Sequence, residues 1–210
     1  MIRTIIYVDG FNLYYGSLRK TPYKWLDLKA LFTTLLNKQN EIVEIKYFTA
    51  RISPQYKGDN SNDRQKIYLK ALEAHINNIS IYYGHYLSHI VNVKVHNPPP
   101  ASPPYLDIIK TEEKGSDVNL SLHILNDAWL DRYDCAVLVS NDGDIAEALR
   151  FVKEDHNKKI GLFIPGKDRK ISKELQKYAT FIKRIRPNDL LSSQLPNPIQ
   201  NTQLFKPKEW

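Results

Sequence analysis

Two aspartates directly follow an apolar run in the middle of the chain. Residues 136–139 are apolar and rich in valine, which is typical of a strand buried on both faces of a parallel sheet, and apolar residues then return at helical spacing from 145 to 152. Asp142 and Asp144 therefore stand where a strand becomes a helix, at the edge of an α/β sheet where ligands bind. The alternative is structural: Asp142 caps the helix and Asp144 complements its dipole.

A second acid stands in the same kind of position near the start of the chain. Residues 4–8 form another buried-strand pattern that ends at Asp9, before the sequence turns helical. Asn12 follows three residues later, where it either caps the helix or reaches toward a ligand. The cap is the more common role for such an asparagine.

A third acid, Asp117, precedes or opens a helix. Apolar residues follow it at spacings of four, three and four, which predicts a buried stripe on one helical face made of Val118, Leu122, Leu125 and Trp129. Asp117 then serves either as a partner of the helix dipole or as a carboxylate aimed at the same edge as Asp9 and Asp142.

The remaining elements alternate between strands and helices, which predicts a mostly parallel sheet flanked by helices. We expect further strands at 41–52, 79–87, 90–95, 105–110, 159–165 and 181–185, and further helices at 28–36, from near 62, and at 171–178. Five prolines between 97 and 104 predict a stiff loop joining the two arms of a β-hairpin insertion near 88–111. We assign 1–186 to one domain and 187–210 to an extended or partly disordered tail, and we expect its apolar end to dock on the chain itself or on a protein partner.

Composition excludes several classes of protein. Of the 210 residues, 42% are hydrophobic and 25% are charged, as in ordinary globular domains. No apolar run approaches the roughly 20 residues of a membrane span, and the first residues lead into a strand pattern rather than a signal peptide. The single Cys135 permits neither an intrachain disulfide nor a cysteine-based zinc site. We therefore expect a soluble, cytoplasmic protein, and the sequence leaves homo-oligomerisation open.

Positive charge is concentrated after the acidic turn. The formal net charge is +7, and residues 150–186 contain twelve Lys or Arg against four Asp or Glu. Such a block beside an acidic pocket could follow a phosphate backbone. The alternative is an ordinary solvated surface.

Acids from three separate elements should meet at one sheet edge. Carboxylates packed together repel one another, and a divalent cation is the usual source of compensating charge. Oxygen-only ligands favour Mg²⁺ or Mn²⁺, which bind through a few carboxylates plus substrate phosphates. The pattern therefore predicts one or two Mg²⁺ or Mn²⁺ ions and hydrolysis of a phosphodiester.

Three segments together resemble the signatures of NYN domains, in the LabA/DUF88-like branch of the PIN-like nucleases. They are Val8-Asp9-Gly10-Phe11-Asn12, Glu113-Lys114-Gly115-Ser116-Asp117-Val118 and Leu138-Val139-Ser140-Asn141-Asp142-Gly143-Asp144. The resemblance implies a Rossmann-like (PIN-like) sheet over 1–186 and metal-dependent cleavage of RNA, single-stranded or structured.

The resemblance also implies roles for individual residues. Asp9, Asp117 and Asp142 would hold the metal, and Asp144 would act as a further ligand or as a water-orienting base. Asn12, Ser140 and Asn141 would be auxiliary residues of the pocket. As RNA contacts we expect basic residues from the block and from nearby elements: Arg51, Arg64, Lys114, Lys167, Arg169, Lys170 and Lys173.

Two other functions remain open. His123 stands where many relatives have another helix acid, which favours a catalytically weak or inactive RNA-binding or regulatory module of the same fold. A phosphatase or nucleotidase would also place Asp residues at strand ends. However, Asp9-Gly10-Phe11 lacks the second acid two residues on that a phosphoaspartate-forming hydrolase usually carries.

Overall fold

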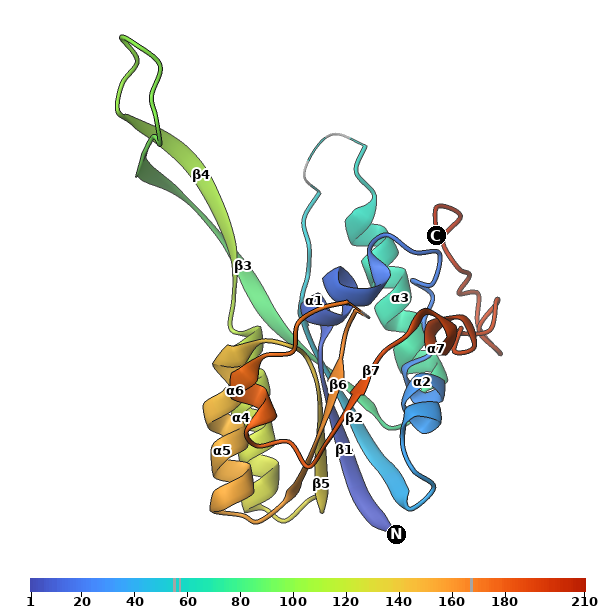
Figure 1. The fold of residues 1–210 in the computed structure, drawn as a ribbon. Coiled ribbons are helices and arrows are strands. Elements are labelled where there is room, and N and C mark those ends of the chain that lie inside the picture. The colour runs from blue at the N-terminus through green and yellow to red at the C-terminus, as the bar shows by residue number, and fades with distance from the viewer. Residues whose placement is uncertain (55, 57, 167) are drawn as a thin grey trace.

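A seven-stranded sheet in the order β4-β3-β2-β1-β5-β6-β7 forms the centre of the molecule (Figure 1). The computed structural model describes residues 1–54, 56, 58–166 and 168–210. The strands are β1 (Ile2–Asp9), β2 (Asn40–Ala50), β3 (Ile79–Lys94), β4 (Tyr105–Lys114), β5 (Cys135–Val139), β6 (Lys159–Ile164) and β7 (Phe181–Arg184). All neighbouring strands pair in parallel except β3 and β4, which form an antiparallel hairpin.

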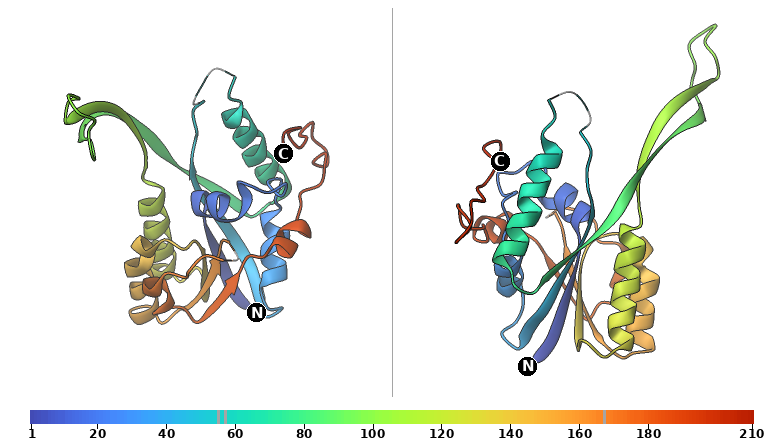
Figure 2. Two further views of the ribbon diagram at one scale, coloured as in Figure 1. Left: turned by 45° about the horizontal axis from the view of Figure 1, so that its top comes forward. Right: turned by 180° about the vertical axis from the view of Figure 1, so that it is seen from behind.

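Helices connect the strands and cover both faces of the sheet. They are α1 (Gly10–Leu13), the π-helical turn η1 (Tyr14–Leu18), α2 (Leu28–Leu35), α3 (Ser61–His75), α4 (Ser116–Trp129), the 3₁₀ turn η2 (Gly143–Ile145), α5 (Ala146–Glu154), α6 (Lys173–Gln176) and α7 (Pro187–Leu191). The group α4, α5 and α6 lies on one side of the sheet, and α2, α3 and α7 lie on the other (Figures 1 and 2). Within the described chain, no helix is long and apolar enough to cross a membrane.

Alternating residues of the central strand divide the apolar core into two layers. Ile6 and Val8 pack with α2 and α3, whereas Ile5 and Tyr7 pack with α4 and α5. This alternation follows from the two-residue period of a strand, and burial on both faces explains why β1 and β5 read as continuous apolar runs. The expected fold class is therefore confirmed.

The strand order changes direction at the pair β1 and β5. From β1 the chain proceeds outward through β2 and β3, whereas β5, β6 and β7 proceed toward the opposite edge. In open α/β sheets such a switch point leaves a crevice at the carboxyl ends of the two strands. Asp9 ends β1, and residues 140–142 follow β5, so both acidic turns open onto this crevice.

The hairpin insertion is longer and more continuous than the sequence predicts. The expected strands at 79–87 and 90–95 are a single strand, β3, whose first half pairs in parallel with β2 and whose second half pairs with β4. The outer part of this hairpin leaves the body as a projecting arm (Figure 1). The break expected at residues 88–89 is absent because the backbone ladder with β4 continues through Ser88 and His89.

The predicted apolar stripe on α4 was wrong. Val118, Leu122 and Trp129 are 62%, 59% and 78% exposed, whereas Leu120 and Ile124 are fully buried. The inward face also carries Asp127, which is buried and accepts hydrogen bonds from the Tyr7 hydroxyl and the Lys46 ammonium. A polar group therefore marks the inward face, which hydrophobic periodicity alone did not identify.

The chain after residue 186 is not simply extended. Pro187–Leu191 forms α7, and Leu195 and Ile199 are buried in the core layer of α2 and α3. The Trp210 ring packs 6.4 Å from Trp25 and 5.8 Å from Tyr68, measured between ring centroids. The last residues therefore contact the body of the same chain.

Candidate active site

Asp9 is held by hydrogen bonds to both of its carboxylate oxygens. Oδ1 accepts the backbone N–H of Asn12 at 2.8 Å and so caps α1, while Oδ2 accepts the Ser140 hydroxyl at 2.8 Å. The side chain is only 6% exposed. Asp9, rather than Asn12, is therefore the helix cap, and the Ser140 bond joins the ends of β1 and β5.

Burial perturbs the pKa of this carboxyl group. Desolvation raises the pKa of Asp9 to about 6, partly offset by the hydrogen bonds from Asn12 and Ser140, while Asp117 and Asp142 add repulsion. A buried carboxylate that favours its neutral form is a frequent mark of a functional site. A cation at this position would reverse that preference.

The loop after β5 places Asp142 at the same crevice. Its backbone N–H donates to the Ser140 hydroxyl at 3.1 Å, and its Oδ1 accepts the backbone N–H of Asp144 at 3.0 Å. Asn141 points away and bonds the loop before α6 through the Lys170 carbonyl and the Ser172 N–H. Asp142 thus combines the capping role with a position at the crevice.

Asp117 reaches the crevice from the junction of β4 and α4. Its pKa is raised by partial desolvation and then by repulsion from Asp142, Glu113 and Asp144. Glu113 lies just before the turn and accepts both the N–H and the hydroxyl of Ser116, at 3.1 and 2.8 Å. Acids from three chain segments therefore interact electrostatically at one place.

A glycine permits this junction to approach β3. A Cβ built on Gly84 would lie 2.1 Å from the Glu113 carboxylate and 2.6 Å from the Lys114 carbonyl. Any larger residue would push the β4–α4 turn away from the sheet. Glu113 is also the cross-strand partner of Tyr86, so the register of the hairpin determines which side chains reach the crevice.

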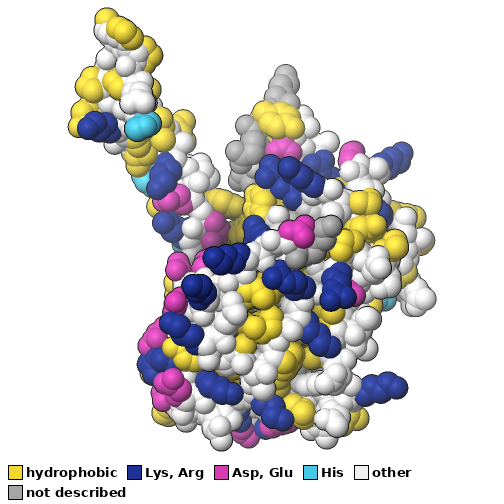
Figure 3. Space-filling model, viewed as in Figure 1, with side chains coloured by type: hydrophobic (Ala, Val, Ile, Leu, Met, Phe, Trp, Pro, Cys, Tyr) yellow, Lys and Arg dark blue, Asp and Glu magenta, His cyan; other side chains and the backbone are white. Residues whose placement is uncertain are grey.

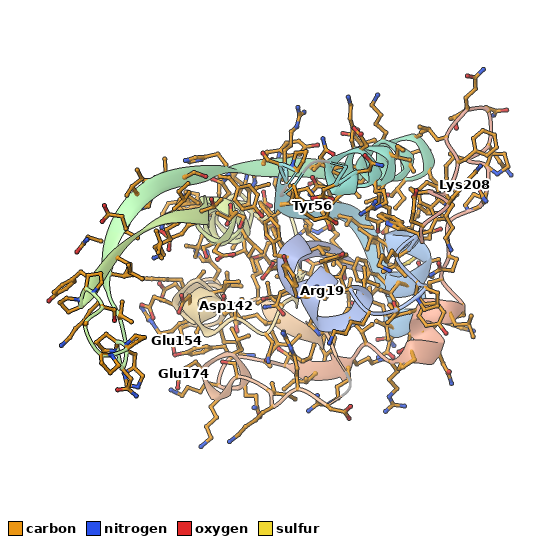
Figure 4. All side chains as sticks on the ribbon, turned by 90° about the horizontal axis from the view of Figure 1, so that it is seen from above. Arg19, Tyr56, Asp142, Glu154, Glu174 and Lys208 are labelled. Atoms are coloured by element: carbon orange, nitrogen blue, oxygen red, sulfur yellow. The ribbon has the colours of Figure 1, made fainter. Side chains whose placement is uncertain are left out.

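These groups line one cavity of about 390 Å³, which we call the acidic cavity. Its lining residues are Asp9, Phe11, Asn12, Tyr15, Tyr86, Glu113, Ser116, Asp117, Asp142 and Arg169. Arg169 comes from the loop before α6 and donates to the Asn12 side chain at 3.3 Å. Figure 4 looks onto this side of the molecule, with Asp142 labelled beside the turn that follows β5 and Arg19 labelled just after the end of η1.

The structure brings most of the predicted site together. Asp9, Asn12, Asp117 and Asp142 line the acidic cavity, and Ser140 lies directly beneath it through its bond to Asp9. Asn141 and the exposed Asp144 are adjacent in the loop but are not among the residues that line it.

Five lining residues were missed from the sequence: Phe11, Tyr15, Tyr86, Glu113 and Ser116. Glu113 had a usable signal, because it is an acid at the end of a strand, three residues before the start of a helix. The aromatic residues had no such signal, because the sequence contains many aromatic residues and nothing in its pattern sets these three apart.

The donor set fits a hard divalent cation in its chemistry. The carboxylates of Asp9, Asp117 and Asp142 offer oxygen ligands only, which suits Mg²⁺ or Mn²⁺. Within the described residues, no three His, Cys, Asp or Glu side chains are grouped closely enough to form a complete metal site by themselves. An ion held by these carboxylates would need water or substrate oxygens to complete its shell.

The predicted RNA contacts are spread over different surfaces. Arg169 lines the acidic cavity, Arg64 lines a neighbouring cavity, and Lys170 and Lys173 are exposed near Arg169. Arg51 stacks on Tyr83 with its guanidinium carbon 4.9 Å from the ring centroid, and Lys114 pairs with Glu112 at 3.2 Å. Lys167 lies outside the described residues.

The basic block is not one continuous patch. Arg150 pairs with Glu147 and Glu154, Lys158 with Asp131, and Lys177 with Glu174. In Figure 3, Lys and Arg side chains are scattered over the visible face, with acidic side chains along its edge. Among the described residues of the block, Arg169 alone lines the acidic cavity.

His123 lies apart from the acidic cavity. Its ring is 4.0 Å from Tyr82 and 5.4 Å from Phe48, between ring centroids, and it does not line the cavity. Desolvation, followed by the charge of Lys46, lowers its pKa.

Comparison with known proteins identifies relatives over most of the chain. Residues 3–190 match the model of the NYN domain. A relative from Pseudomonas putida (strain DSM 28022 / S16), named 6-hydroxy-3-succinoylpyridine 3-monooxygenase HspA, is 36% identical over 235 aligned residues, which cover 100% of this chain and 75% of the relative.

A solved structure shares the fold. The crystal structure of a protein of unknown function, VPA0982 from Vibrio parahaemolyticus RIMD 2210633, superposes with a TM-score of 0.56 at 19% sequence identity. The match covers 92% of this chain and 96% of that one, and at this identity it supports the architecture alone.

Proposed function

Because the chain belongs to the NYN domain family, within the PIN-like nuclease superfamily, we propose that it is a metal-dependent endoribonuclease acting at the acidic cavity. The observation that carries the proposal is that Asp9, Asp117 and Asp142, from three separate elements, line one cavity together with Arg169. The carboxylates suit a divalent cation, and the arginine suits a phosphate group. Hydrolysis of a phosphodiester with a bound metal ion would use both.

Asp9, Asp142 and Asp117 would hold Mg²⁺ or Mn²⁺ in one or two positions. When bound, the ion supplies positive charge that offsets the carboxylates and stabilises charge developing on the phosphate. The Ser140 hydroxyl and the Asn12 N–H fix the orientation of Asp9 through both carboxylate oxygens. These two hydrogen bonds hold the Asp9 carboxylate in one orientation toward the metal position.

The chain's own residues then position the substrate. Arg169 contacts a non-bridging oxygen of the scissile phosphate, and Asp144, exposed beside the cavity, orients the attacking water and takes its proton. The water oxygen forms the new bond to phosphorus as the bond to the leaving oxygen breaks. The leaving oxygen takes a proton from solvent.

The first experiment measures cleavage of a labelled RNA by the purified chain with Mn²⁺, Mg²⁺ or EDTA. Asp142→Asn should reduce the rate at least about a hundredfold, because it removes a charged ligand at the site of charge development. Asp155→Asn, which removes an exposed acid outside the cavity, is the matched control and should cleave normally. RNA binding without cleavage would instead favour the regulatory module.

The relative from P. putida favours a second candidate function. A monooxygenase that acts on a hydroxypyridine places one atom of dioxygen in its substrate and releases the other as water, using two electrons from a reductant. If this chain did the same, dioxygen uptake with reduced nicotinamide or flavin would depend on 6-hydroxy-3-succinoylpyridine. Such uptake, without RNA cleavage, would replace the nuclease proposal.

A further inference from the structure

A second, larger cavity of about 840 Å³ adjoins the acidic cavity. Phe11, Tyr15 and Tyr86 line both, so the two cavities share an aromatic wall. The rings of Phe11 and Tyr86 meet edge to face with centroids 6.2 Å apart. We call this second cavity the aromatic pocket, because Tyr14, Tyr68 and Trp210 add further rings to its lining.

Positive charge accompanies the rings. Arg19, Lys24 and Arg64 line the aromatic pocket, and Glu209 is the one acid among its described lining residues. Desolvation, then the neighbouring charges of Lys206 and Arg64, lowers the pKa of Lys24. Cations that repel one another in a partly dry cavity indicate a site for an anion.

Rings and cations together match the chemistry of a nucleotide. Aromatic side chains stack on any base because every base has a π face, and arginine and lysine contact its phosphate. The volume lies within the roughly 300–1,000 Å³ of pockets that enclose small ligands. Stacking requires a base that is free of its partner strand, which favours single-stranded RNA.

We propose that the aromatic pocket binds the nucleotide next to the cleaved bond, with its base among the rings and its phosphate at Lys24 and Arg64. The inference rests on the proposed function and specifies its substrate class as unpaired RNA. Because Phe11, Tyr15 and Tyr86 line both cavities, an RNA strand that leaves the acidic cavity along these rings would reach the aromatic pocket next.

The test uses the full chain in EDTA, so that binding is measured without cleavage. A fluorescent single-stranded RNA and a duplex of the same sequence are titrated at several salt concentrations with four proteins: wild type, Arg64→Gln, Lys66→Gln and Tyr14→Leu. Lys66 is the matched control, because it is an exposed cation of the same helix that does not line the pocket.

We expect the single strand to bind more tightly than the duplex. Arg64→Gln should reduce the slope of log K against log salt by about 0.7, the value for one phosphate contact on a single strand, while Lys66→Gln should leave it unchanged. Tyr14→Leu should weaken binding about tenfold through lost stacking. AMP should displace the RNA at lower concentration than ribose 5-phosphate, which carries the phosphate without the base.

Equal affinities and slopes for the wild type and the two pocket variants would overturn the pocket proposal, as would tighter binding of duplex. Its failure is separable from that of the proposed function. If Asp142→Asn abolishes metal-dependent cleavage while Arg64→Gln binds RNA as the wild type does, the pocket proposal is rejected and the nuclease proposal stands. Binding that depends on Arg64 without any metal-dependent cleavage would reject the nuclease alone.

Discussion

Asp9 is a carboxylate placed where an apolar strand meets a helix. Burying it there in its ionised form lowers the stability of the folded state. Its pKa is about 6 in the folded chain against an ordinary value of 3.8. Below the lower value the group is protonated in both the folded and the unfolded state. As pH rises from about 4 to about 6, the unfolded chain loses this proton first, so the folded state loses stability; above about 6 the difference is constant.

Replacing Asp9 by Asn should therefore stabilise the chain while removing activity. In EDTA at pH 8 the free energy of unfolding should rise by up to about 3 kcal/mol, the equivalent of roughly two pKa units. At pH 3.5 the gain should almost vanish. Urea unfolding at the two pH values measures the difference, with Asp155→Asn, which removes an exposed acid outside the cavity, measured alongside as the matched variant. A variant less stable than the wild type at pH 8 would contradict this account of Asp9.

The helix α4 illustrates what decides orientation at the scale of an element. Two apolar stripes run along it, and the structure buries the stripe with Leu120 and Ile124 while leaving Val118 and Leu122 exposed. The buried stripe also carries Asp127, whose second oxygen bonds Arg132 at 3.1 Å. A buried carboxylate is tolerated there because Lys46 and Tyr7 supply its partners.

A pair of identical substitutions on α4 tests this orientation. Leu120→Ala removes a fully buried side chain and should reduce the free energy of unfolding by about 3 kcal/mol. Leu122→Ala removes a side chain that is 59% exposed and should change it by less than about 0.5 kcal/mol. Denaturant unfolding of both variants provides the comparison, and a larger loss for Leu122→Ala would place the helix the other way round.

At the scale of the whole molecule, positive charge is spread over the surface. We expect it to contribute to RNA binding mainly where a loop brings it to the acidic cavity. Arg150 and Lys177 each form an ion pair with an acid three residues earlier in the chain, Glu147 and Glu174. Arg169 lines the acidic cavity, and Lys170 and Lys173 are exposed within four residues of it in the chain. We therefore expect this loop to contribute most of the salt-sensitive RNA affinity.

The triple variant Arg169→Gln, Lys170→Gln and Lys173→Gln should flatten the salt dependence of RNA binding. With each phosphate contact on a single strand contributing about 0.7, the slope should fall in magnitude by about 2. A control triple, Lys29→Gln, Lys38→Gln and Lys70→Gln, changes the net charge equally at exposed positions elsewhere. Equal slopes in the two triples would show that net charge, rather than this loop, governs binding.

The sequence by itself determined the sheet and the acids at its edge. Strand and helix patterns alternate, so the strands run parallel, and parallel strands present their carboxyl ends on one side. Asp9 and Asp142 could therefore be predicted to meet, because Asp9 ends one buried strand and Asp142 lies in the turn that follows another. That inference needs only local pattern and a topological rule.

Only the tertiary structure decided which other side chains join them. Glu113 and Tyr86 reach the acidic cavity because the hairpin register pairs them and Gly84 leaves room for the turn. Trp210 reaches the aromatic pocket because the end of the chain packs back against Trp25 and Tyr68. These contacts join residues far apart in sequence, and neither periodicity nor composition records such distances.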